Sequence, residues 1–229
     1  MQAERVALNT WWERDPDQRY WMEVATTGHM GEILIAPKFP GAHWSYQLVG
    51  LVRAGDTILH WQSDPAARGF VGWSVAAADP EVVPEYTWQP RGTSGRALSG
   101  PRTTEGWMVT LGGLNHFPQP PTLDEMRELI GHVQEVSDAL VLEHRKPTYF
   151  PFYVYGGREL RAQQGYLMKF PVELFSVLPN IRRRTYPRRW PKRRGRSGGQ
   201  RTSERGGVEG SSYPRPRPSA AVRYRNARR

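Results

Sequence analysis

Short apolar runs with a period of two residues dominate the first half of the chain and predict a fold rich in strands. Tyr46–Val52 and Thr57–Trp61 are rich in β-branched and aromatic residues, and the sequence Arg-Ala-Gly-Asp at 53–56 separates them. This arrangement predicts a β-hairpin, and Gly69–Ala76 predicts a third strand after a polar loop. We expect the rest of the fold to be organised around this unit.

Further aromatic or branched runs on both sides of this unit predict additional strands. The segment at 91–104 is rich in Gly, Ser, Thr and Arg, which is typical of a loop. The additional strands are expected at Asn9–Glu13, Arg19–Thr26, Ile33–Ile35, Tyr86–Trp88 and Trp107–Leu111.

The second half of the chain predicts helices. Thr122 and Glu125 form a capping box at the start of Leu123–Glu143, and apolar residues recur along this segment at helical spacing. Arg158–Lys169 is expected to form a second helix, and Val172–Leu178 one further apolar turn. Strands followed by helices indicate an α+β fold.

The composition changes abruptly after Pro179. Residues 181–229 hold 17 of the 32 Lys and Arg residues but only 2 of the 22 Asp and Glu residues, without any apolar period. We therefore predict a disordered basic tail at 181–229 behind a folded domain at 1–180. Two origins of the tail remain open: a natural arm that binds phosphates, or a shifted reading frame of GC-rich coding sequence.

The net charge of +10 does not describe the domain, because residues 1–180 carry 15 basic and 20 acidic side chains, a balance of −5. The chain-wide charge is thus no sign that the domain itself binds nucleic acid. The absence of cysteine excludes disulfides and thiolate metal sites. No signal peptide or membrane-spanning run is found, so we expect a cytoplasmic protein.

No motif for catalysis or cofactor binding is found. Gly72–Ala76 resembles a nucleophile elbow, but Pro80 and Pro84 prevent a helix from following Ser74. The six histidines lack metal-binding spacing, and no glycine-rich phosphate loop occurs. We therefore expect no catalytic residue, no cofactor and no metal.

Aromatic residues are in surplus, since eight of the nine tryptophans lie within residues 11–107. A single Trp usually fills a core, but rings from several strands can also enclose a planar base. Alternation along the strand at 57–61 places His60 and Trp61 on opposite faces, next to each other at the strand end. A flat apolar ring beside hydrogen-bonding groups suits a planar polar ligand.

Four short motifs, in this order, resemble the EVE-type domains of the PUA-like superfamily: TWW…RYWMEV, LVRAGD, TILHWQS and VGWSVA. The resemblance covers Asn9–Pro179 and is greatest to the specificity half of modification-dependent restriction proteins with a C-terminal HNH nuclease. The sequence QQGYLMKFPVELFSVLP also resembles the segment that precedes this nuclease. The chain departs from such proteins after residue 180, where no HNH-like cluster of His and Asn occurs.

The resemblance implies a small, strongly bent β-barrel flanked by helices, in which a modified DNA base is flipped into an aromatic cage. The implied base is 5-methylcytosine or 5-hydroxymethylcytosine. We expect several of the indole rings to converge on one slot. By the resemblance and the aromatic surplus, the candidate base-binding residues are Trp11, Trp12, His60, Trp61, Ser63, Trp73, Ser74 and Trp88, and loop arginines Arg91, Arg96 and Arg102 are candidate phosphate contacts.

The leading hypothesis is therefore a non-enzymatic reader of a modified base, with DNA as the expected partner and no membrane partner. Three alternatives remain open. In these alternatives the chain is an RNA-binding PUA-like module, the truncated or frame-shifted binding half of an HNH endonuclease, or a generic small-molecule barrel.

Overall fold

The computed structural model describes residues 8–25, 29–64, 68–89, 100–121, 123–178 and 180–181. The strands are β1 (Tyr20–Ala25), β2 (Ile33–Lys38), β3 (Thr57–Gln62), β4 (Gly69–Val75), β5 (Glu81–Trp88), β6 (Arg102–Thr110), β7 (Asn115–His116), β8 (Phe152–Tyr155), β9 (Glu159–Ala162) and β10 (Leu167–Lys169). The α-helices are α1 (Trp44–Gln47), α3 (Leu123–Glu128) and α4 (Ile130–His144), and the 3-10 helices are η1 (Trp11–Arg14), η2 (Leu48–Leu51) and η3 (Val172–Ser176).

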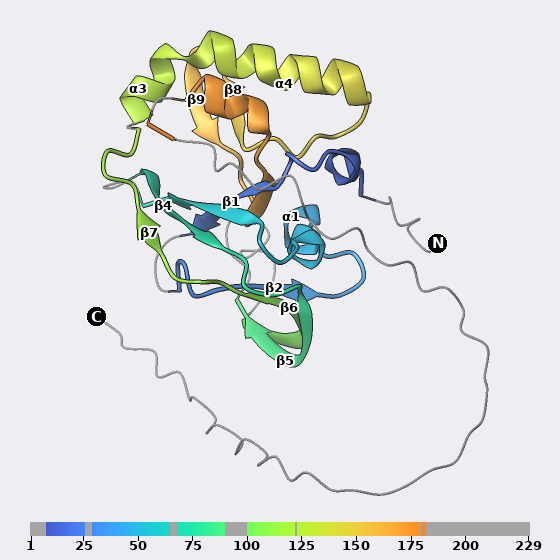
Figure 1. Ribbon diagram of the computed structural model, residues 1–229. Helices are drawn as coiled ribbons and strands as arrows, with labels where there is room; N and C mark the ends of the chain where they lie inside the picture. The colour runs from blue at the N-terminus through green and yellow to red at the C-terminus, as the bar shows by residue number, and fades with distance from the viewer. Residues whose placement is uncertain are drawn as a thin grey trace, which may run out of the picture. The chain divides into compact units, whose positions relative to one another are not determined.

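The strands form a mixed five-stranded sheet in the order β10-β1-β3-β4-β7, a three-stranded sheet β2-β6-β5 and the hairpin β8-β9 (Figure 1). β1 and β3 run parallel at the centre, and their neighbours are antiparallel. A bridge between Ala76 and Leu111 connects the two larger sheets. The expected α+β class is confirmed, but within the described residues the sheets do not close into a barrel, so the strongly bent barrel stays a prediction.

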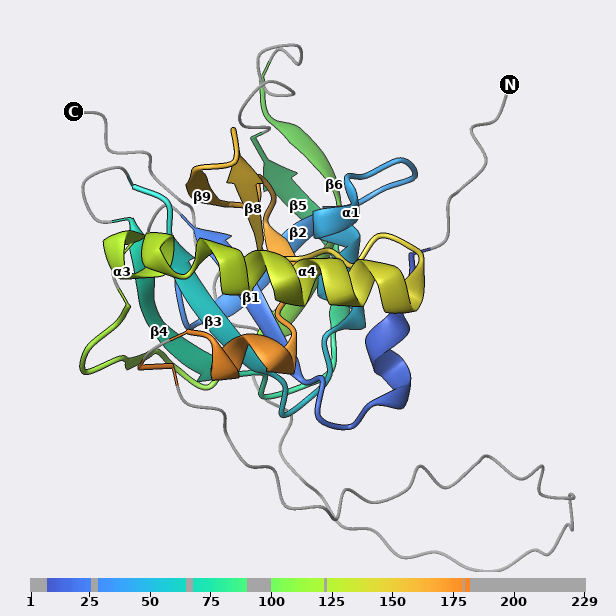
Figure 2. The same cartoon turned by 90° about the horizontal axis from the view of Figure 1, so that it is seen from above.

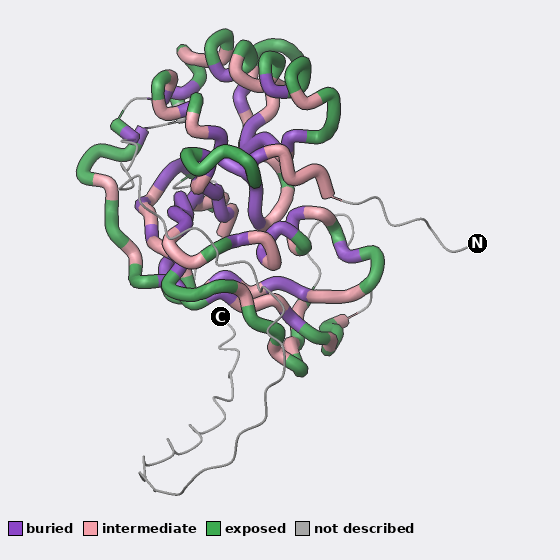
Figure 3. The backbone as a smooth tube through the Cα atoms, turned by 45° about the vertical axis from the view of Figure 1, so that its right-hand side comes forward, coloured by how far each residue is buried: buried purple, intermediate pink, exposed green. Residues whose placement is uncertain are grey.

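The central sheet separates two hydrophobic cores, and β3 contributes to both. Leu59 and Trp61 belong to the first core, together with residues of α3, α4, β8 and η3. Ile58 belongs to the second core, with residues of β2, β6 and η2. Figure 2 shows α4 and η3 lying over the β1–β3–β4 sheet, and in Figure 3 the buried stretches gather inside an exposed outer layer. The predicted alternation along β3 is confirmed.

Two segments predicted as strands are helical instead. Tyr46–Val52 lies in α1, η2 and the residue after it, so the predicted hairpin with β3 is wrong. Its buried residues Leu48, Val49 and Val52 recur at helical spacing, and they pack into the second core. Asn9–Glu13 is likewise not a strand, because Trp11 begins the 3-10 helix η1.

The predictions for the second half are partly correct. Leu123–Glu143 is helical except for a break at Leu129, which separates α3 from α4. The predicted helix at Arg158–Lys169 is wrong, because β9 pairs with β8 and β10 pairs with β1. The tertiary fold brings β9 and β10 to these partner strands, and the local sequence carries no signal of the pairing. Thr122 of the capping box and residues 182–229 lie outside the described residues.

Candidate functional site

A chain of three buried polar side chains crosses the central strands on the side of the second core. Glu23 on β1, His60 on β3 and Ser74 on β4 lie on neighbouring strands, and Glu23 is directly opposite His60. The Glu23 Oε2 atom lies 2.7 Å from His60 Nδ1, and His60 Nε2 lies 2.7 Å from Ser74 Oγ. His60 and Ser74 are fully buried, and Glu23 is 4% exposed. We call these residues the polar triplet.

Hydrogen-bond chemistry determines which atoms of the polar triplet donate. A carboxylate can only accept, so Nδ1 of His60 donates to Oε2 of Glu23. In the neutral tautomer that carries this hydrogen, Nε2 accepts from the hydroxyl of Ser74. The three side chains are thereby linked in one buried hydrogen-bonded chain.

Tyr166, which precedes β10, connects the polar triplet to a group of aromatic rings. Its hydroxyl accepts a hydrogen bond from the backbone N–H of Ile35 at 3.1 Å. Burial, and then the negative charge of Glu23, raise the pKa of Tyr166 well above its ordinary value. The ring of Tyr46 lies 6.3 Å from that of Tyr166 and 5.6 Å from that of Trp88. The hydroxyl of Tyr166 therefore lies near Glu23 while its ring lies near Tyr46.

Trp88, at the end of β5, completes this arrangement. Its ring lies 5.9 Å from that of Phe39 at an interplanar angle of 25°, and it is nearly perpendicular to Tyr46 at 68°. We call Phe39, Tyr46, Trp88 and Tyr166 the ring group. Three segments far apart in the sequence supply it, namely the β2–α1 region, β5 and the residue before β10.

The indole nitrogen of Trp88 is buried and has no hydrogen-bond partner among the residues that the structure describes. Leaving a buried donor unpaired costs about 1–3 kcal/mol. No other side-chain nitrogen or oxygen in the described ranges is buried in this way. A ligand with a hydrogen-bond acceptor would satisfy this N–H group.

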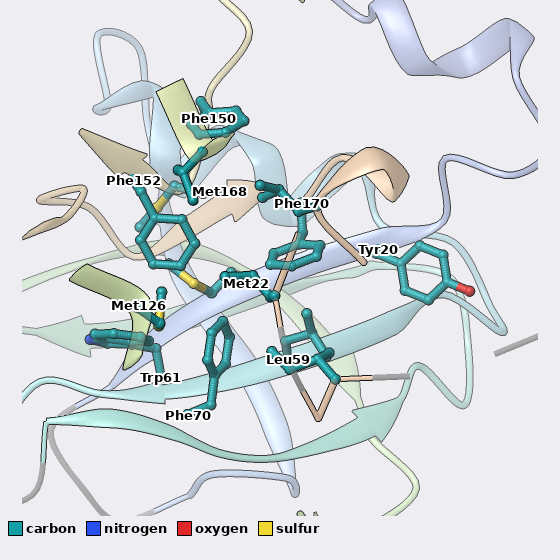
Figure 4. Close-up of a cluster of buried hydrophobic side chains, with 14 of the residues drawn as sticks. Tyr20, Met22, Leu59, Trp61, Phe70, Met126, Phe150, Phe152, Met168 and Phe170 are labelled. Atoms are coloured by element: carbon teal, nitrogen blue, oxygen red, sulfur yellow. The ribbon is translucent and has the colours of Figure 1, made fainter. Parts of the chain in front are cut away.

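Two of the predicted base-binding tryptophans lie on the other side of the sheet. Trp61 is 1% exposed and packs against Phe70 at 5.0 Å and Phe152 at 5.6 Å between ring centroids. Figure 4 shows these three rings together in the first core. Trp73 is directly opposite Leu59 and packs against the same core. The predicted convergence of the indole rings on one slot is therefore wrong, because Trp61 and Trp73 pack in the first core whereas Trp88 lies with Phe39 and Tyr46.

The N-terminal tryptophans and Ser63 make structural contacts of their own. Trp12 is buried in the second core next to Trp21, with ring centroids 5.4 Å apart. Trp11 stacks on His144 at the end of α4, at 4.8 Å and 22°. The hydroxyl of Ser63 donates to the backbone carbonyl of Ala25 at 3.1 Å, which ties the ends of β3 and β1 together.

Of the predicted phosphate contacts, only Arg102 lies in the described part of the chain, since Arg91 and Arg96 fall within the gap at 90–99. Arg102 is exposed at the start of β6 and is directly opposite Trp88 on β5. It is therefore the predicted arginine that lies beside the ring group.

The sequence did not predict which residues contact His60, Ser74 and Trp88. Glu23 carried a signal, because a charged residue within the apolar strand sequence RYWMEV needs a buried partner. Tyr166 carried none, since its segment was predicted as a helix. Tyr46 was assigned to a strand, although it lies in α1.

No protein-family model and no curated protein matches the chain. Several solved structures are similar to it. Human THYN1 in complex with DNA containing 5-methylcytosine has a TM-score of 0.39 and 11% identity, covering 69% of this chain and 93% of that one. The DUF55 domain of human thymocyte nuclear protein 1 has a TM-score of 0.34 and 10% identity, covering 56% of this chain and 87% of that one.

The N-terminal domain of Staphylothermus marinus McrB is a further neighbour, with a TM-score of 0.36 and 16% identity over 70% of this chain and 93% of that one. With TM-scores below 0.4 and identities of 10–16%, these three structures assign neither a family nor a site residue to this chain.

The polar triplet has the residue order of a serine hydrolase triad, but its geometry does not fit that chemistry. Ser74 lies in the middle of β4 and is fully buried, so no substrate carbonyl reaches its oxygen. In the described ranges no group of three or more His, Asp and Glu side chains could hold a metal ion. No helix there is both long enough and apolar enough to span a membrane. The arrangement is suited to holding a planar ligand by rings and hydrogen bonds.

Proposed function

We propose that this chain binds DNA and receives one modified base, turned out of the duplex, against the ring group and above the polar triplet. The observation that carries the proposal is the buried, unpaired Nε1–H group of Trp88 within a set of aromatic rings. The sequence resemblance to EVE-type domains supports the same ligand class. Because the described residues do not outline a closed cage, the cage itself is part of the proposal.

The energetics of base flipping are compatible with such a site. Unstacking a base from the duplex costs a few kcal/mol, and stacking on an aromatic ring returns about 1–3 kcal/mol per base. The ring of Trp88 meets Tyr46 nearly edge to face, so the ring group offers surfaces in two orientations. Hydrogen bonds to the base edge supply the remaining free energy and the discrimination.

The unpaired donor of the ring group limits which base edges it can meet. The Trp88 N–H group complements a hydrogen-bond acceptor on the base, and cytosine carries such acceptors on its edge. The sequence resemblance to EVE-type domains implies a modified cytosine. We therefore propose 5-methylcytosine or 5-hydroxymethylcytosine as the base to test first.

Fluorescence anisotropy with duplexes that differ only in one cytosine, unmodified, 5-methylated or 5-hydroxymethylated, tests the proposal. We expect tighter binding to a modified duplex. Trp88→Phe keeps a ring but removes the N–H group, so it should weaken binding to that duplex about 3- to 10-fold, the equivalent of one hydrogen bond. Trp73→Phe, on the opposite face of the sheet, is the matched control and should bind as the parent protein does.

Equal affinity for modified and unmodified duplexes would overturn the modified-base proposal. Loss of discrimination in Trp73→Phe but not in Trp88→Phe would move the site to the first core. A single-stranded RNA of the same sequence, bound more tightly than any of the duplexes, would favour the RNA-binding alternative.

A further inference from the structure

Arg102, the first residue of β6, lies beside the ring group. It is directly opposite Trp88 on the antiparallel strand β5. Residues in such a pair project to the same face of the sheet, with Cβ atoms about 4.5–5.5 Å apart. The Arg102 side chain therefore leaves the sheet next to the Trp88 ring and on the same face.

The guanidinium group of Arg102 is available to an anion. Arg102 is exposed, and it forms no ion pair with a residue that the structure describes. Glu105, the one acidic residue of β6, accepts from Lys38 Nζ instead, at 3.1 Å. A guanidinium group carries five N–H donors in a planar fork that matches the oxygens of a phosphate.

His43, the residue before α1, is a second exposed polar side chain at the ring group. Its ring lies 6.3 Å from that of Tyr46, and the Tyr46 ring lies 5.6 Å from that of Trp88. His43 itself is exposed. Two neighbouring rings of the group thus each have an exposed side chain with N–H donors beside them, Arg102 next to Trp88 and His43 next to Tyr46.

Hydrogen bonds determine which nitrogen of His43 carries the hydrogen. The backbone N–H of Ser45 donates to His43 Nδ1 at 3.4 Å. The Ser45 hydroxyl lies 2.8 Å from the same Nδ1 atom, and it accepts from the backbone N–H of Tyr166 at 3.1 Å. Because Nδ1 accepts, the hydrogen of the neutral ring is on Nε2.

The Nε2–H group of His43 remains as a donor. Partial burial lowers the pKa of His43 below its ordinary value, which favours the neutral ring at pH 7. Within the described ranges, Nε2 makes no hydrogen bond. The bonds to Ser45 hold the imidazole in place, so this donor is positioned before a ligand binds.

We infer that Arg102 and His43 bind the two phosphates that flank the flipped nucleotide in its strand. The inference rests on the proposed function for the identity of the ligand. A flipped base stays joined to its sugar, so the two adjoining phosphates remain near the rings that hold the base. Phosphate contacts of this kind position a protein on DNA without reading its sequence. Arg102 and His43 position the backbone, and the N–H group of Trp88 reads the base.

The test measures binding of the full chain to duplexes in which one phosphate beside the target cytosine, on its 5′ or its 3′ side, is an uncharged methylphosphonate. Each replacement should weaken binding of the parent protein. Arg102→Gln should weaken binding to the unaltered duplex about tenfold or more, as expected for a charge-assisted hydrogen bond. This variant should no longer respond to one of the two replacements.

His43→Ser should weaken binding about 3- to 10-fold and lose the response to the other replacement. Serine keeps an N-cap for α1 but has no group at the position of Nε2. If His43→Ser unfolds, His43→Gln replaces it in the test, because its amide keeps a donor and should retain most of the parent's affinity.

Salt dependence separates the two residues. Loss of one phosphate contact made by a charged group should reduce the slope of log affinity against log salt by about 0.9, which is expected for Arg102→Gln. His43→Ser should keep the slope of the parent, because a neutral imidazole displaces no counterion. Arg127→Gln is the matched control, since it removes an exposed arginine from α3, whose neighbouring residue Met126 lies in the first core. This control should respond to both replacements as the parent does.

The outcomes separate this inference from the proposed function, because every titration is made with a modified and an unmodified cytosine. If both variants responded to both replacements as the parent does, the inference would be overturned, even if the protein still discriminated the modified base. Lost responses in the variants with equal affinity for both cytosines would support the phosphate contacts and overturn the modified-base proposal. The same losses in Arg127→Gln would show a nonspecific charge effect and overturn the inference.

Discussion

Lys169 is the most unusual single residue of the domain, because its ammonium group lies in the second core. Its Nζ atom donates to the backbone carbonyl of Gln18 at 2.7 Å and lies 4.2 Å from the centroid of the Trp21 ring. The centroid of the Trp12 ring lies 5.4 Å from the same Nζ atom. Burial lowers the pKa of Lys169 from 10.5 to about 7, and the charge of Asp56 acts in the opposite direction. Folding therefore favours the neutral amine.

This pKa shift predicts a pH-dependent stability. Between about pH 7 and pH 10.5 the unfolded chain binds a proton at Lys169 that the folded chain does not, so the free energy of unfolding should rise with pH in this window. The slope from one such group is at most about 1.4 kcal/mol per pH unit. Urea unfolding at pH 7, 8 and 9 measures it. Lys169→Met should show a shallower rise than the parent protein.

The matched control is Lys146→Met, which removes an exposed lysine and should keep the slope of the parent. If Lys169→Met had the same slope as the parent, the buried amine would not be the group that titrates in this window.

At the scale of elements, the residue pattern along the chain predicted the strands that combine strand-forming residues with a buried face. β1, β3 and β4 were found because each combines branched and aromatic residues with a buried face. The runs at 46–52 and 158–169 were assigned wrongly, since short apolar segments fit a strand or a helix equally well. Their state is decided by neighbours distant in sequence, such as β1 for β10.

Strand β4 provides a prediction at this scale. A Cβ atom added to Gly72 would collide with the backbone carbonyl oxygen of Asn115 in β7. Gly72→Ala should therefore disturb the β4–β7 pairing and lower the free energy of unfolding by about 1–3 kcal/mol. Urea unfolding measures this loss.

Gly131→Ala is the matched control, because a Cβ at this position in α4 meets no atom within 4 Å. Replacing an exposed helical glycine with alanine should stabilise the protein by up to about 1 kcal/mol. Equal stability of Gly72→Ala and the parent would mean that β7 moves away from β4 without cost.

At the scale of the whole molecule, acidic and basic residues are unevenly distributed along the chain. Residues 1–180 carry a net charge of −5, and residues 181–229 carry +15. If the domain reads the base and the segment attracts phosphates, the two contributions to binding are separable. The attraction of DNA phosphates to many Lys and Arg residues is independent of the DNA sequence and falls steeply as the salt concentration rises.

Removal of residues 182–229 should therefore weaken binding to modified and unmodified duplexes by the same factor, about tenfold or more at low salt. The ratio of the two affinities should stay as in the full chain. Anisotropy titrations of both proteins with both duplexes measure this ratio. A ratio that fell to one on truncation would assign the discrimination to the segment.

The sequence by itself determined the α+β class, the alternation that puts His60 and Trp61 on opposite faces of β3, and the change of composition after Pro179. These features depend on local periodicity and on charge, which can be counted along the chain. Only the tertiary structure decided that Trp61 fills a core, that Glu23 and Ser74 flank His60, and that Trp88 lies with Phe39 and Tyr46. The contacts of His60 and Trp88 join residues 14 to 49 positions apart in the sequence. They depend on strand order and register, which no local pattern specifies.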